Sequence, residues 1–392
     1  MRVLDGGDVI IGDRLLPGGS VIIDGDSIAE VRAGGSKRID SAERLDVRGC
    51  LVAPGFIDVH VHGVDGHDSL DGPGALRRIA AALPRFGVTA FCPTTVACDP
   101  GTLRVLLEEV RALRQAPPRD AARVLPAHLE SNFIEPTLRG AQPAEHLRAP
   151  AGEAGAAYAA DEILRVIADH RAEVGIVTLA PELPGGLELV GWLVAAGHRV
   201  SLGHSAADFE QAHAAFDAGA RQVTHLFNRM PPMVHRAPGL AGAALDRDDV
   251  FVELIADGYH VHPAMARLVT RVKTPSRVMV ISDGTGGAGL PVGSCARLGG
   301  RRIHVRDDAA FLDDGTLAGS TLTMDRAFRL VVTLLGEAPV AAATMCATAP
   351  ARALGLPNRG IIAAGAAADL VVLDADLRVR HTFVGGHLAY SR

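Results

Sequence analysis

Histidines and carboxylates follow short apolar runs at several places in the sequence, where their side chains could bind a metal ion together. His60 and His62 are two residues apart, so on a β-strand both would point to the same side. Glu130, His204 and His225 follow other apolar runs. Imidazole nitrogens and carboxylate oxygens are ligands suited to Zn²⁺ and to other divalent transition metals. The sequence therefore predicts a divalent metal site built from these residues.

An aspartate after a further apolar run, Asp283, would complete a hydrolytic site. A metal with an open coordination position lowers the pKa of a bound water toward ~7 and so yields hydroxide at neutral pH. Asp283 could act as general base on that water and then as general acid to the leaving group. A single histidine at a strand end is more often a hydrogen-bonded structural group, and we assign that role to His128, His198 and His262.

Short apolar runs alternate with longer stretches of helical pattern along the middle of the chain. The predicted strands are 51–60, 88–94, 123–130, 174–181, 199–204, 222–227, 250–257 and 277–283, and the predicted helices include 74–86, 102–115, 161–173, 187–196, 206–218 and 263–272. This alternation predicts an α/β fold, a (β/α)8 TIM-type barrel, in which catalytic residues lie at the C-terminal ends of the strands. An open doubly wound sheet is the alternative, although no GxGxxG motif follows the first strand.

Both ends of the chain differ from the middle, because short β-like runs there alternate with turn signals such as Gly18-Gly19 and Gly385-Gly386. We predict two domains: a small β-sandwich domain built from residues 1–50 and 358–392, and the metal-dependent hydrolase barrel over residues 51–357.

Composition excludes several classes of protein. The chain has 392 residues, 48% of them hydrophobic, and a net charge of −6 without a basic patch, which argues against a nucleic-acid partner. No apolar run reaches the ~18 residues of a membrane span, and the N-terminus lacks a signal-peptide pattern. The five cysteines form no CxxC pair. We expect a cytoplasmic protein that binds no membrane.

Motifs over nearly the whole chain resemble the amidohydrolase superfamily and, within it, the N-acetylglucosamine-6-phosphate deacetylase family. The matching stretches are 54–63 (PGFIDVHVHG), 128–130 (HLE), 179–182 (LAPE), 203–205 (GHS), 224–228 (THLFN), 236–240 (RAPGL), 256–258 (ADG), 260–263 (HVHP), 282–283 (SD) and 317–320 (LAGS). The resemblance implies a metal-dependent deacetylase that releases acetate from an N-acetylated amino-sugar phosphate.

The resemblance also implies roles for single residues. Glu130, His204 and His225 would hold the main metal, and Asp283 would handle the protons. His60 and His62 match family members that carry a second metal, so one or two ions are implied, most simply Zn, with Fe or Mn as alternatives. The implied substrate-binding positions are Ala141, Gln142, Asn228, Arg229, Arg236, His260, Leu317 and Ala318. In the family, the arginine at the position of Arg236 reaches the neighbouring active site, so a homodimer is implied.

Two stretches depart from the family pattern. Ser131-Asn132 follows the ligand Glu130 where the family has Gly-Pro, and Gly284-Thr285-Gly286-Gly287 follows Asp283 where the family has small and Met residues. Both would line the site mouth, the first with added hydrogen-bonding groups and the second as a looser loop. We therefore hypothesise that substrate choice has drifted to another N-acyl amino sugar, or to one without phosphate.

Two rival functions remain open at this point. Another amidohydrolase, such as a cyclic-amide hydrolase, would commonly bridge two metals by a carbamylated lysine on the fourth strand, but this strand ends in Leu179-Ala180-Pro181-Glu182. A barrel without activity that binds a sugar phosphate would be signalled by loss of Asp283 or a metal histidine, and all of these are present.

Overall fold

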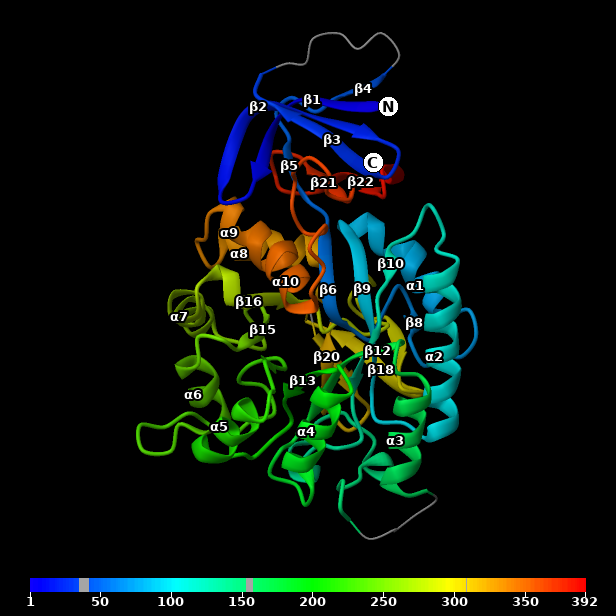
Figure 1. Cartoon of the computed structure of the whole chain (residues 1–392), viewed down its shortest axis with the longest axis vertical. Coiled ribbons are helices and arrows are strands. Elements are labelled where there is room, and N and C mark those ends of the chain that lie inside the picture. The colour runs from blue at the N-terminus through cyan, green and yellow to red at the C-terminus, as the bar shows by residue number, and fades with distance from the viewer. Residues whose placement is uncertain (35–41, 153–157, 308) are drawn as a thin grey trace.

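The computed structural model describes residues 1–34, 42–152, 158–307 and 309–392, and its centre is a parallel barrel (Figure 1). The barrel strands are β6 (Phe56–Val61), β9 (Val88–Thr95), β10 (Arg123–Val124) with β11 (Ala127–Glu130), β12 (Val174–Leu179), β13 (Arg199–Leu202), β14 (Gln222–Val223), β15 (Phe251–Ile255) and β16 (Val278–Ile281). The ring closes where Val61 bridges Gly284 and the Asp283 N–H donates to the His60 carbonyl at 2.9 Å. The predicted (β/α)8 barrel is confirmed.

The apolar runs became barrel strands because both faces of such a strand are covered, one by the barrel interior and one by helices. Every residue of β9, β15 and β16 is buried. Glu253 in β15 is the one charged residue within these three strands, and it is fully buried. Such a carboxylate needs partners inside the protein, and these lie at the candidate site.

Helices surround the barrel, and the six predicted ones are present. They are α1 (Ala75–Ala82) with the 3-10 turn η1 (Leu83–Phe86), α2 (Pro100–Gln115), α3 (Ala160–Asp169), α4 (Gly186–Ala195), α5 (Phe209–Asp217) and α7 (Pro263–Lys273). Local signals fix their starts: Asp99 accepts the N–H groups of Gly101 and Thr102 at 2.9 and 3.0 Å at the start of α2, and Asp208 forms a capping box with Gln211 on α5.

Several elements were not predicted. They are the helices α6 (Gly239–Asp246), α8 (Met324–Thr333), α9 (Pro339–Ala343) and α10 (Ala349–Leu354), the π-helical turn η5 (Thr344–Thr348), the 3-10 turns η2 (Pro136–Leu138), η3 (Ala144–His146) and η4 (Pro275–Arg277), and the short strands β7 (Gly63–Val64) and β8 (His67–Asp68). The α6 stretch is almost wholly Gly, Ala and Leu, so it carries no polar face that would mark a helical period.

Both chain ends join in one small sheet above the barrel in Figure 1, as predicted. Its strands are β1 (Arg2–Ile11), β2 (Arg14–Asp24), β3 (Ser27–Arg32), β4 (Glu43–Asp46), β5 (Leu51–Pro54), β21 (Leu370–Leu373), β22 (Val379–Val384) and β23 (His387–Ser391). Hydrogen bonds connect them in the order β23-β22-β21-β5-β1-β2-β3, with β4 branching from β1. Residues 35–41 of the first predicted range lie outside the described residues.

The predicted strand 51–60 is two strands in the structure. The first, β5, pairs with β1 and β21 in the small sheet, and the second, β6, starts the barrel. Pro54-Gly55 separates them, and a Cβ on Gly55 would lie 2.2 Å from the Thr89 side chain, so only glycine fits at this crossing. The small sheet therefore extends to Pro54, past the boundary at residue 50. The domain limits remain a proposal.

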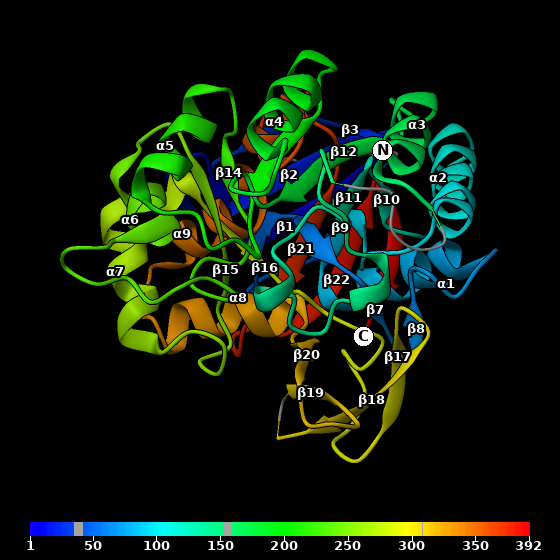
Figure 2. The ribbon, with the colours of Figure 1, turned by 90° about the horizontal axis from the view of Figure 1, so that it is seen from below.

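A second antiparallel sheet, also not predicted, follows the last barrel strand (Figure 2). It consists of β17 (Cys295–Leu298), β18 (Arg301–Arg306), β19 (Ala309–Leu312) and β20 (Leu317–Ser320). One face packs an apolar cluster of Val96, Leu298, Ile303, Ala310, Leu312 and Ala318. Ser320 bridges Gly284, which anchors the sheet beside the end of β16.

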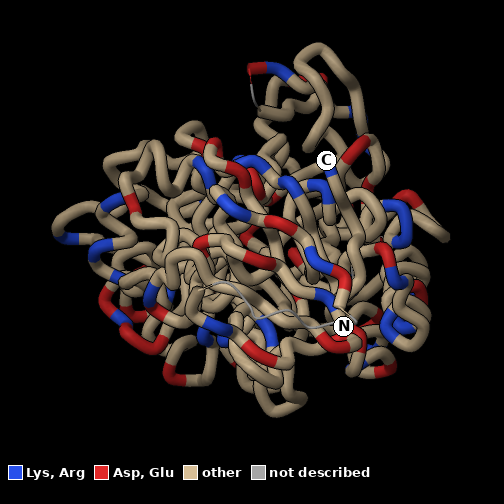
Figure 3. The backbone as a smooth tube through the Cα atoms, turned by 90° about the horizontal axis from the view of Figure 1, so that it is seen from above, with Lys and Arg blue, Asp and Glu red and all other residues tan. Residues whose placement is uncertain are grey.

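Charged residues of both signs are mixed along the chain. Figure 3 shows Lys and Arg interspersed with Asp and Glu along the described backbone. Within the described residues, no helix combines the length and the apolar character that crossing a bilayer requires. Because charges of both signs are mixed along the chain, an anionic ligand would depend on a few cations placed at its binding site.

Candidate active site

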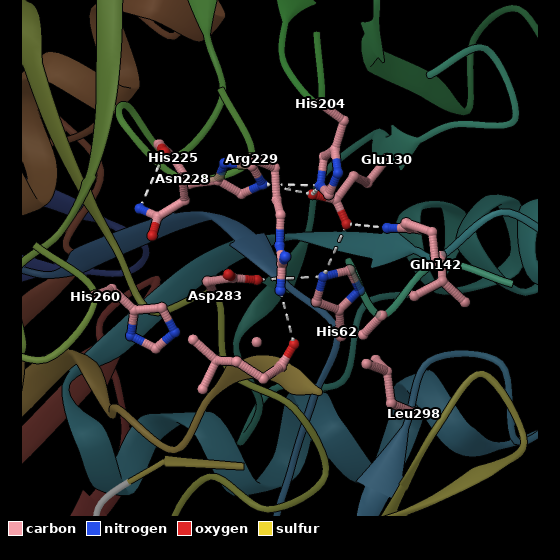
Figure 4. A pocket seen from close by; sticks show the side chains of 14 residues that line it. His62, Glu130, Gln142, His204, His225, Asn228, Arg229, His260, Asp283 and Leu298 are labelled. Carbon is pink, nitrogen blue, oxygen red and sulfur yellow. Dashed lines mark hydrogen bonds and ion pairs between the residues drawn. The ribbon is translucent and has the colours of Figure 1, made fainter. Parts of the chain in front are cut away.

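Side chains from the C-terminal ends of the barrel strands converge on one cavity (Figure 4). Glu130 is the last residue of β11, and His60 and His62 lie at the end of β6. His204, His225 and Asp283 each lie two residues beyond their strands, which are β13, β14 and β16. The structure therefore brings together every residue that the sequence predicted as a metal ligand, with the predicted catalytic aspartate beside them.

Glu130 is shared by two histidine pairs. Its Oε1 lies 3.0 Å from His204 Nε2 and 2.9 Å from His225 Nε2. Its Oε2 lies 3.5 Å from His62 Nε2, and Oε1 lies 3.6 Å from His60 Nε2. The Nε2 atoms within each pair are 3.1 Å and 3.3 Å apart. The donor atoms thus form two three-residue clusters, Glu130–His204–His225 and His60–His62–Glu130, that share one carboxylate.

Hydrogen bonds on the far side of the ring fix how two of these histidines, His60 and His204, face the clusters. His60 Nδ1 lies 2.9 Å from Glu253 Oε2, and His204 Nδ1 lies 2.8 Å from the Leu138 carbonyl. Because carboxylate and carbonyl oxygens only accept, both Nδ1 atoms donate, and both Nε2 atoms turn inward. Each Nε2 then faces another ring nitrogen or a carboxylate oxygen, and a proton or a metal cation must lie between the two facing atoms.

The electrostatics of the site favour positive charge at its centre. Burial by itself would lower the pKa of His60, but the carboxylates of Glu253 and Asp283 outweigh burial and raise it to about 10. Burial would also raise the pKa of Glu130, yet His204 and His225 hold it well below 4.5. Glu130 is therefore a carboxylate, and the inward nitrogens, oxygens and charges fit a divalent cation in either cluster.

Three of these residues have strained backbones. His204, His225 and Asp283 have φ values of 48°, 29° and 47°, in the left-handed region that residues other than glycine rarely adopt. Each such residue costs about 1–3 kcal/mol and persists only where surrounding contacts impose it. The left-handed turn after a barrel strand directs each side chain into the cavity, so the strain coincides with two candidate metal ligands and the candidate catalytic aspartate.

Asp283 lies against the second cluster. Its Oδ1 is 3.4 Å from His60 Nε2 and 3.3 Å from His62 Nε2, and it has no hydrogen-bond partner although it is buried. Burial would raise the pKa of Asp283, but His60 and His62 outweigh burial and lower it. An ionised, buried oxygen without a donor, at the edge of a metal-ligand cluster, is in position to accept a proton from a water molecule.

Glu253 is the functional residue that sequence reasoning missed. Its Oε2 accepts from His60 Nδ1 and from the His225 N–H at 3.2 Å, and its Oε1 accepts from Gln222 Nε2 at 2.6 Å. It therefore orients a ligand from each cluster, as the outer carboxylate of a carboxylate–histidine–metal arrangement does. The signal that could have found it is a lone carboxylate inside the apolar run 250–257.

The histidines that we assigned a structural role form hydrogen bonds to other groups of the protein, and His128 is the clearest case. His128 is buried with Nδ1 on the Val59 carbonyl at 2.9 Å and Nε2 on Thr178 Oγ1 at 2.7 Å, and burial lowers its pKa to about 4. His128, His60 and Glu253 lie close enough to resemble a third metal cluster. Because both nitrogens of His128 have protein partners, this group is a hydrogen-bonded support beneath the site.

A cavity that opens to solvent lies above the clusters. Its lining includes the predicted Ala141, Gln142, Asn228, Arg229, His260 and Leu317, together with Val96, Leu298 and Gly319, which were not predicted. Arg229 is the one Lys or Arg in this lining and crosses the cavity in front of Asp283 (Figure 4). Its Nη2 donates to the Leu317 carbonyl at 3.4 Å.

His260 presents a free nitrogen to the cavity. Asp257 Oδ2 accepts from His260 Nδ1 at 2.6 Å, and the buried Nε2 on the other side of the ring has no partner. Burial alone would lower the pKa of His260, and the hydrogen bond to Asp257 outweighs it and raises that pKa. The ring is therefore oriented to donate from Nε2 to an oxygen of a bound ligand.

Two predicted substrate residues, Ala318 and Gln142, are placed differently, and Arg236 lies outside the cavity of its own chain, in keeping with a residue expected to reach a neighbouring site. Ala318 is fully buried in the apolar cluster of the β17–β20 sheet, and its neighbours Leu317 and Gly319 line the cavity. Arg236 is exposed and lies outside the cavity lining of its own chain. Gln142 lines the cavity, but its Nε2 donates to Glu130 and its Oε1 accepts from the Ala97 N–H at 2.7 Å. Gln142 therefore supports a metal ligand.

The two departures from the family pattern do not alter the cavity as expected. Ser131 Oγ donates to the Thr178 carbonyl at 2.5 Å, and Asn132 Nδ2 donates to the Cys98 carbonyl at 2.8 Å, so both serve packing. The run 284–287 is buried: the Gly284 carbonyl accepts the N–H groups of His62 and Gly63 at 2.8 and 2.9 Å. It is an ordered barrel seam, and the hypothesis of drift loses both of its grounds.

Relatives of known activity resemble this chain over most of its length. A profile of the amidohydrolase family matches residues 51–389. An N-acetylgalactosamine-6-phosphate deacetylase of Escherichia coli O157:H7 is 38% identical and covers 86% of this chain and 88% of that protein. An N-acetylglucosamine-6-phosphate deacetylase of Bos taurus is 36% identical and covers 100% of this chain and 94% of that protein.

Solved structures agree with these relatives. N-acetylglucosamine-6-phosphate deacetylase from Pasteurella multocida has a TM-score of 0.91 at 26% identity, covering 100% of both chains. A mutant of the Mycobacterium smegmatis enzyme, in complex with N-acetyl-D-glucosamine-6-phosphate, has a TM-score of 0.89 at 34% identity and covers 100% of this chain and 99% of that one. The barrel, its histidine–carboxylate clusters and these similarities show that the chain belongs to the amidohydrolase family and, within it, to the N-acetylglucosamine-6-phosphate deacetylases.

Proposed function

We propose that the chain hydrolyses the N-acetyl amide of an amino-sugar phosphate, most directly N-acetylglucosamine 6-phosphate, to acetate and the free amino-sugar phosphate. The observation that carries this proposal is the shared carboxylate Glu130 between two histidine pairs, with the ionised Asp283 at their edge. Amidohydrolases are metal-dependent, and we propose Zn as the metal, with Fe or Mn as alternatives. When bound, the metal would act as a Lewis acid that activates water and polarises the amide carbonyl.

The side chains of this protein supply the remaining steps. Asp283 takes a proton from the attacking water and delivers it to the nitrogen of the leaving amine, so a single group serves as base and then as acid. His260 Nε2 is free to donate to an oxygen of the sugar phosphate or of the acetyl group. Burial of the cluster keeps its charges unscreened, which increases their effect on a developing oxyanion.

Phosphate recognition would come from two arginines. Arg229 offers a guanidinium from the same chain, and guanidinium groups bind phosphate oxygens through paired hydrogen bonds. Arg236 lies on an exposed hairpin with Met233 and Val234, which are 39% and 49% exposed. We propose that this hairpin packs against a second copy in a homodimer and places Arg236 in the neighbouring active site.

Arginine substitutions should separate these two contributions. Arg229→Ala should raise KM for the phosphorylated substrate by roughly 10- to 100-fold, since hydrogen bonds to charged groups contribute about 1.5–3 kcal/mol. Arg236→Ala should have an effect of the same kind, and Arg139→Ala, an exposed arginine outside the cavity lining, should have none. KM for phosphorylated and unphosphorylated N-acetylglucosamine is measured for each. An equal effect on both sugars would show that the arginine is no phosphate ligand.

A mixed dimer tests whether Arg236 acts across subunits. Subunits carrying Arg236→Ala keep Asp283, and subunits carrying Asp283→Asn keep Arg236. In a mixed dimer, the active site with Asp283 would receive Arg236 from the neighbouring subunit. Mixing the two impaired variants under conditions of subunit exchange should restore activity at a substrate concentration below the KM of Arg236→Ala, measured as acetate release. Absence of restoration, with mixed dimers verified by mass spectrometry, would contradict an action of Arg236 across subunits.

The alternative is deacylation of a different N-acyl amino sugar, either phosphorylated or unphosphorylated. The 38% identity to an N-acetylgalactosamine-6-phosphate deacetylase favours the galactosamine epimer as the second candidate. Acetate release from N-acetylglucosamine 6-phosphate, N-acetylgalactosamine 6-phosphate and both unphosphorylated sugars decides between them by kcat/KM. Similar values with and without phosphate would refute the phosphate assignment.

We place the reaction in the cytoplasm, in keeping with five cysteines that form no disulfide.

A further inference from the structure

A second group of reactive side chains lies outside the active site, on the outer face of the β17–β20 sheet. Cys295 in β17 is exposed, whereas the other four cysteines are buried: Cys50, Cys92, Cys98 and Cys346. Cys295 pairs directly with His304 across β17 and β18. The neighbours of this thiol, and not its exposure alone, indicate chemistry.

The contacts around Cys295 have the order nucleophile, base and acid. Cys295 Sγ lies 3.4 Å from His304 Nδ1, and His304 Nε2 lies 2.5 Å from Asp313 Oδ1. Because a carboxylate only accepts, the Nε2 of His304 carries the hydrogen and its Nδ1 offers a lone pair to the thiol. A thiol, an imidazole and an orienting carboxylate in this order form the arrangement that activates nucleophilic cysteines.

A cation completes the group. Arg302 lies in β18 two residues from His304, and its Nη2 donates to Cys295 Sγ at 3.2 Å. A guanidinium N–H directed at sulfur favours the thiolate, which is the reactive form of cysteine. The sheet itself fixes these partners, since Cys295, Arg302 and His304 lie on two adjacent hydrogen-bonded strands and Asp313 follows β19. The arrangement thus combines proton acceptor, orienting acid and anion stabiliser around one accessible sulfur.

We propose that Cys295 is a nucleophilic modification site that forms mixed disulfides with small disulfide molecules. The thiol proton passes to His304 Nδ1, and the thiolate attacks one sulfur of the disulfide. The bond between the two small-molecule sulfurs breaks as the new bond to Cys295 Sγ forms. The other half leaves as a thiolate and takes up the proton. Cys295 is oxidised, the disulfide is reduced, and no further reactant is needed.

The location gives the site a structural link to the active site. β17 carries Leu298, and β20 carries Leu317, both of which line the active-site cavity. The opposite, apolar face of the sheet packs against Val96, another cavity residue. A group attached to Cys295 therefore adds to the outer face of the sheet whose edge forms the cavity wall. The reactivity of Cys295 does not depend on the proposed deacetylase function.

Thiol kinetics on the intact protein test the proposal. An aromatic disulfide, 5,5′-dithiobis(2-nitrobenzoate), should react with one fast thiol, which peptide mapping assigns to Cys295 and Cys295→Ser removes. With iodoacetamide at pH 7, Cys295 should react at least ~10-fold faster than glutathione, because His304 can accept the thiol proton and Arg302 donates to the sulfur. His304→Gln and Asp313→Asn should each slow the alkylation roughly five- to tenfold. Iodoacetamide is uncharged, so attraction of an anionic reagent by Arg302 does not contribute.

A matched control uses Arg297, a second arginine close to Cys295 and on the same strand as that cysteine, β17. Arg297 lies two residues from Cys295 on β17, and among the described residues no hydrogen bond joins the two. Arg297→Gln should leave the alkylation rate unchanged, whereas Arg302→Gln should lower it. Thermal melting verifies that each variant is folded. A rate for Cys295 equal to that of glutathione, or equal rates in His304→Gln, Asp313→Asn and the unmodified sequence, would overturn the proposal.

Discussion

Asp283→Asn is expected to keep the metal and lose most of the turnover. Asparagine has the same shape as aspartate but cannot take a proton from water at neutral pH. No side chain then transfers the proton from the attacking water to the leaving amine. A positioned general acid–base group contributes typically ~10²- to 10⁴-fold, and we expect kcat to fall within that range. The assay is acetate release from N-acetylglucosamine 6-phosphate, with metal content measured on the same sample.

Metal content decides how this result is interpreted. Asp283 Oδ1 lies within 3.4 Å of both His60 and His62 Nε2, close enough to serve as a ligand itself. Loss of metal together with activity would reassign Asp283 from proton carrier to ligand. An unchanged kcat would contradict both roles. Thermal melting separates either outcome from unfolding, since Asp283 occupies a strained backbone position with φ 47° at the barrel seam.

Substitution of the histidines should show which cluster holds the main metal. His204→Ala and His225→Ala each remove a ligand of the Glu130–His204–His225 cluster, and we expect loss of that ion with a fall in kcat of at least ~10³-fold, because the Lewis acid is lost. His62→Ala should remove only an ion held by the His60–His62–Glu130 cluster. Elemental analysis per chain is the measurement, after loading with Zn, Fe or Mn in turn.

The control for these variants is a buried histidine outside the clusters. His198 Nδ1 bonds the Val174 carbonyl at 3.0 Å, and His198→Gln should leave the metal content unchanged. Glu253→Gln should weaken metal binding without removing a ligand, since Glu253 orients His60 and the His225 backbone. Full metal content in His225→Ala would show that the ligands are misassigned. Retention of one equivalent in His62→Ala, from two in the unmodified chain, would support two ions.

The sequence by itself determined the barrel, because its strands are buried on both faces and therefore appear as continuous apolar runs. It also predicted the candidate metal ligands and the catalytic aspartate, since His60, His62, Glu130, His204, His225 and Asp283 follow those runs, and the carboxyl ends of parallel strands meet at one face. Only spacing along the chain was needed for this inference. The resemblance to a known family added the substrate class.

Only the tertiary structure shows which residues support the candidate metal ligands without binding a metal themselves. Glu253 and Gln142 became supports of the ligands because the barrel brings β15 and the 139–142 turn against His60 and Glu130. No local period marks such contacts, which join residues far apart in sequence.

The same reason explains the corrections. Ser131 and Asn132 resemble ligand-binding groups in sequence, but the fold turns them toward backbone carbonyls, where buried polar groups must find partners. The alternation of strand-like and helix-like stretches did not predict the β17–β20 sheet. This sheet forms a wall of the cavity and positions Cys295, His304 and Asp313. Long-range strand pairing and burial, which only the folded chain supplies, decided where these side chains lie.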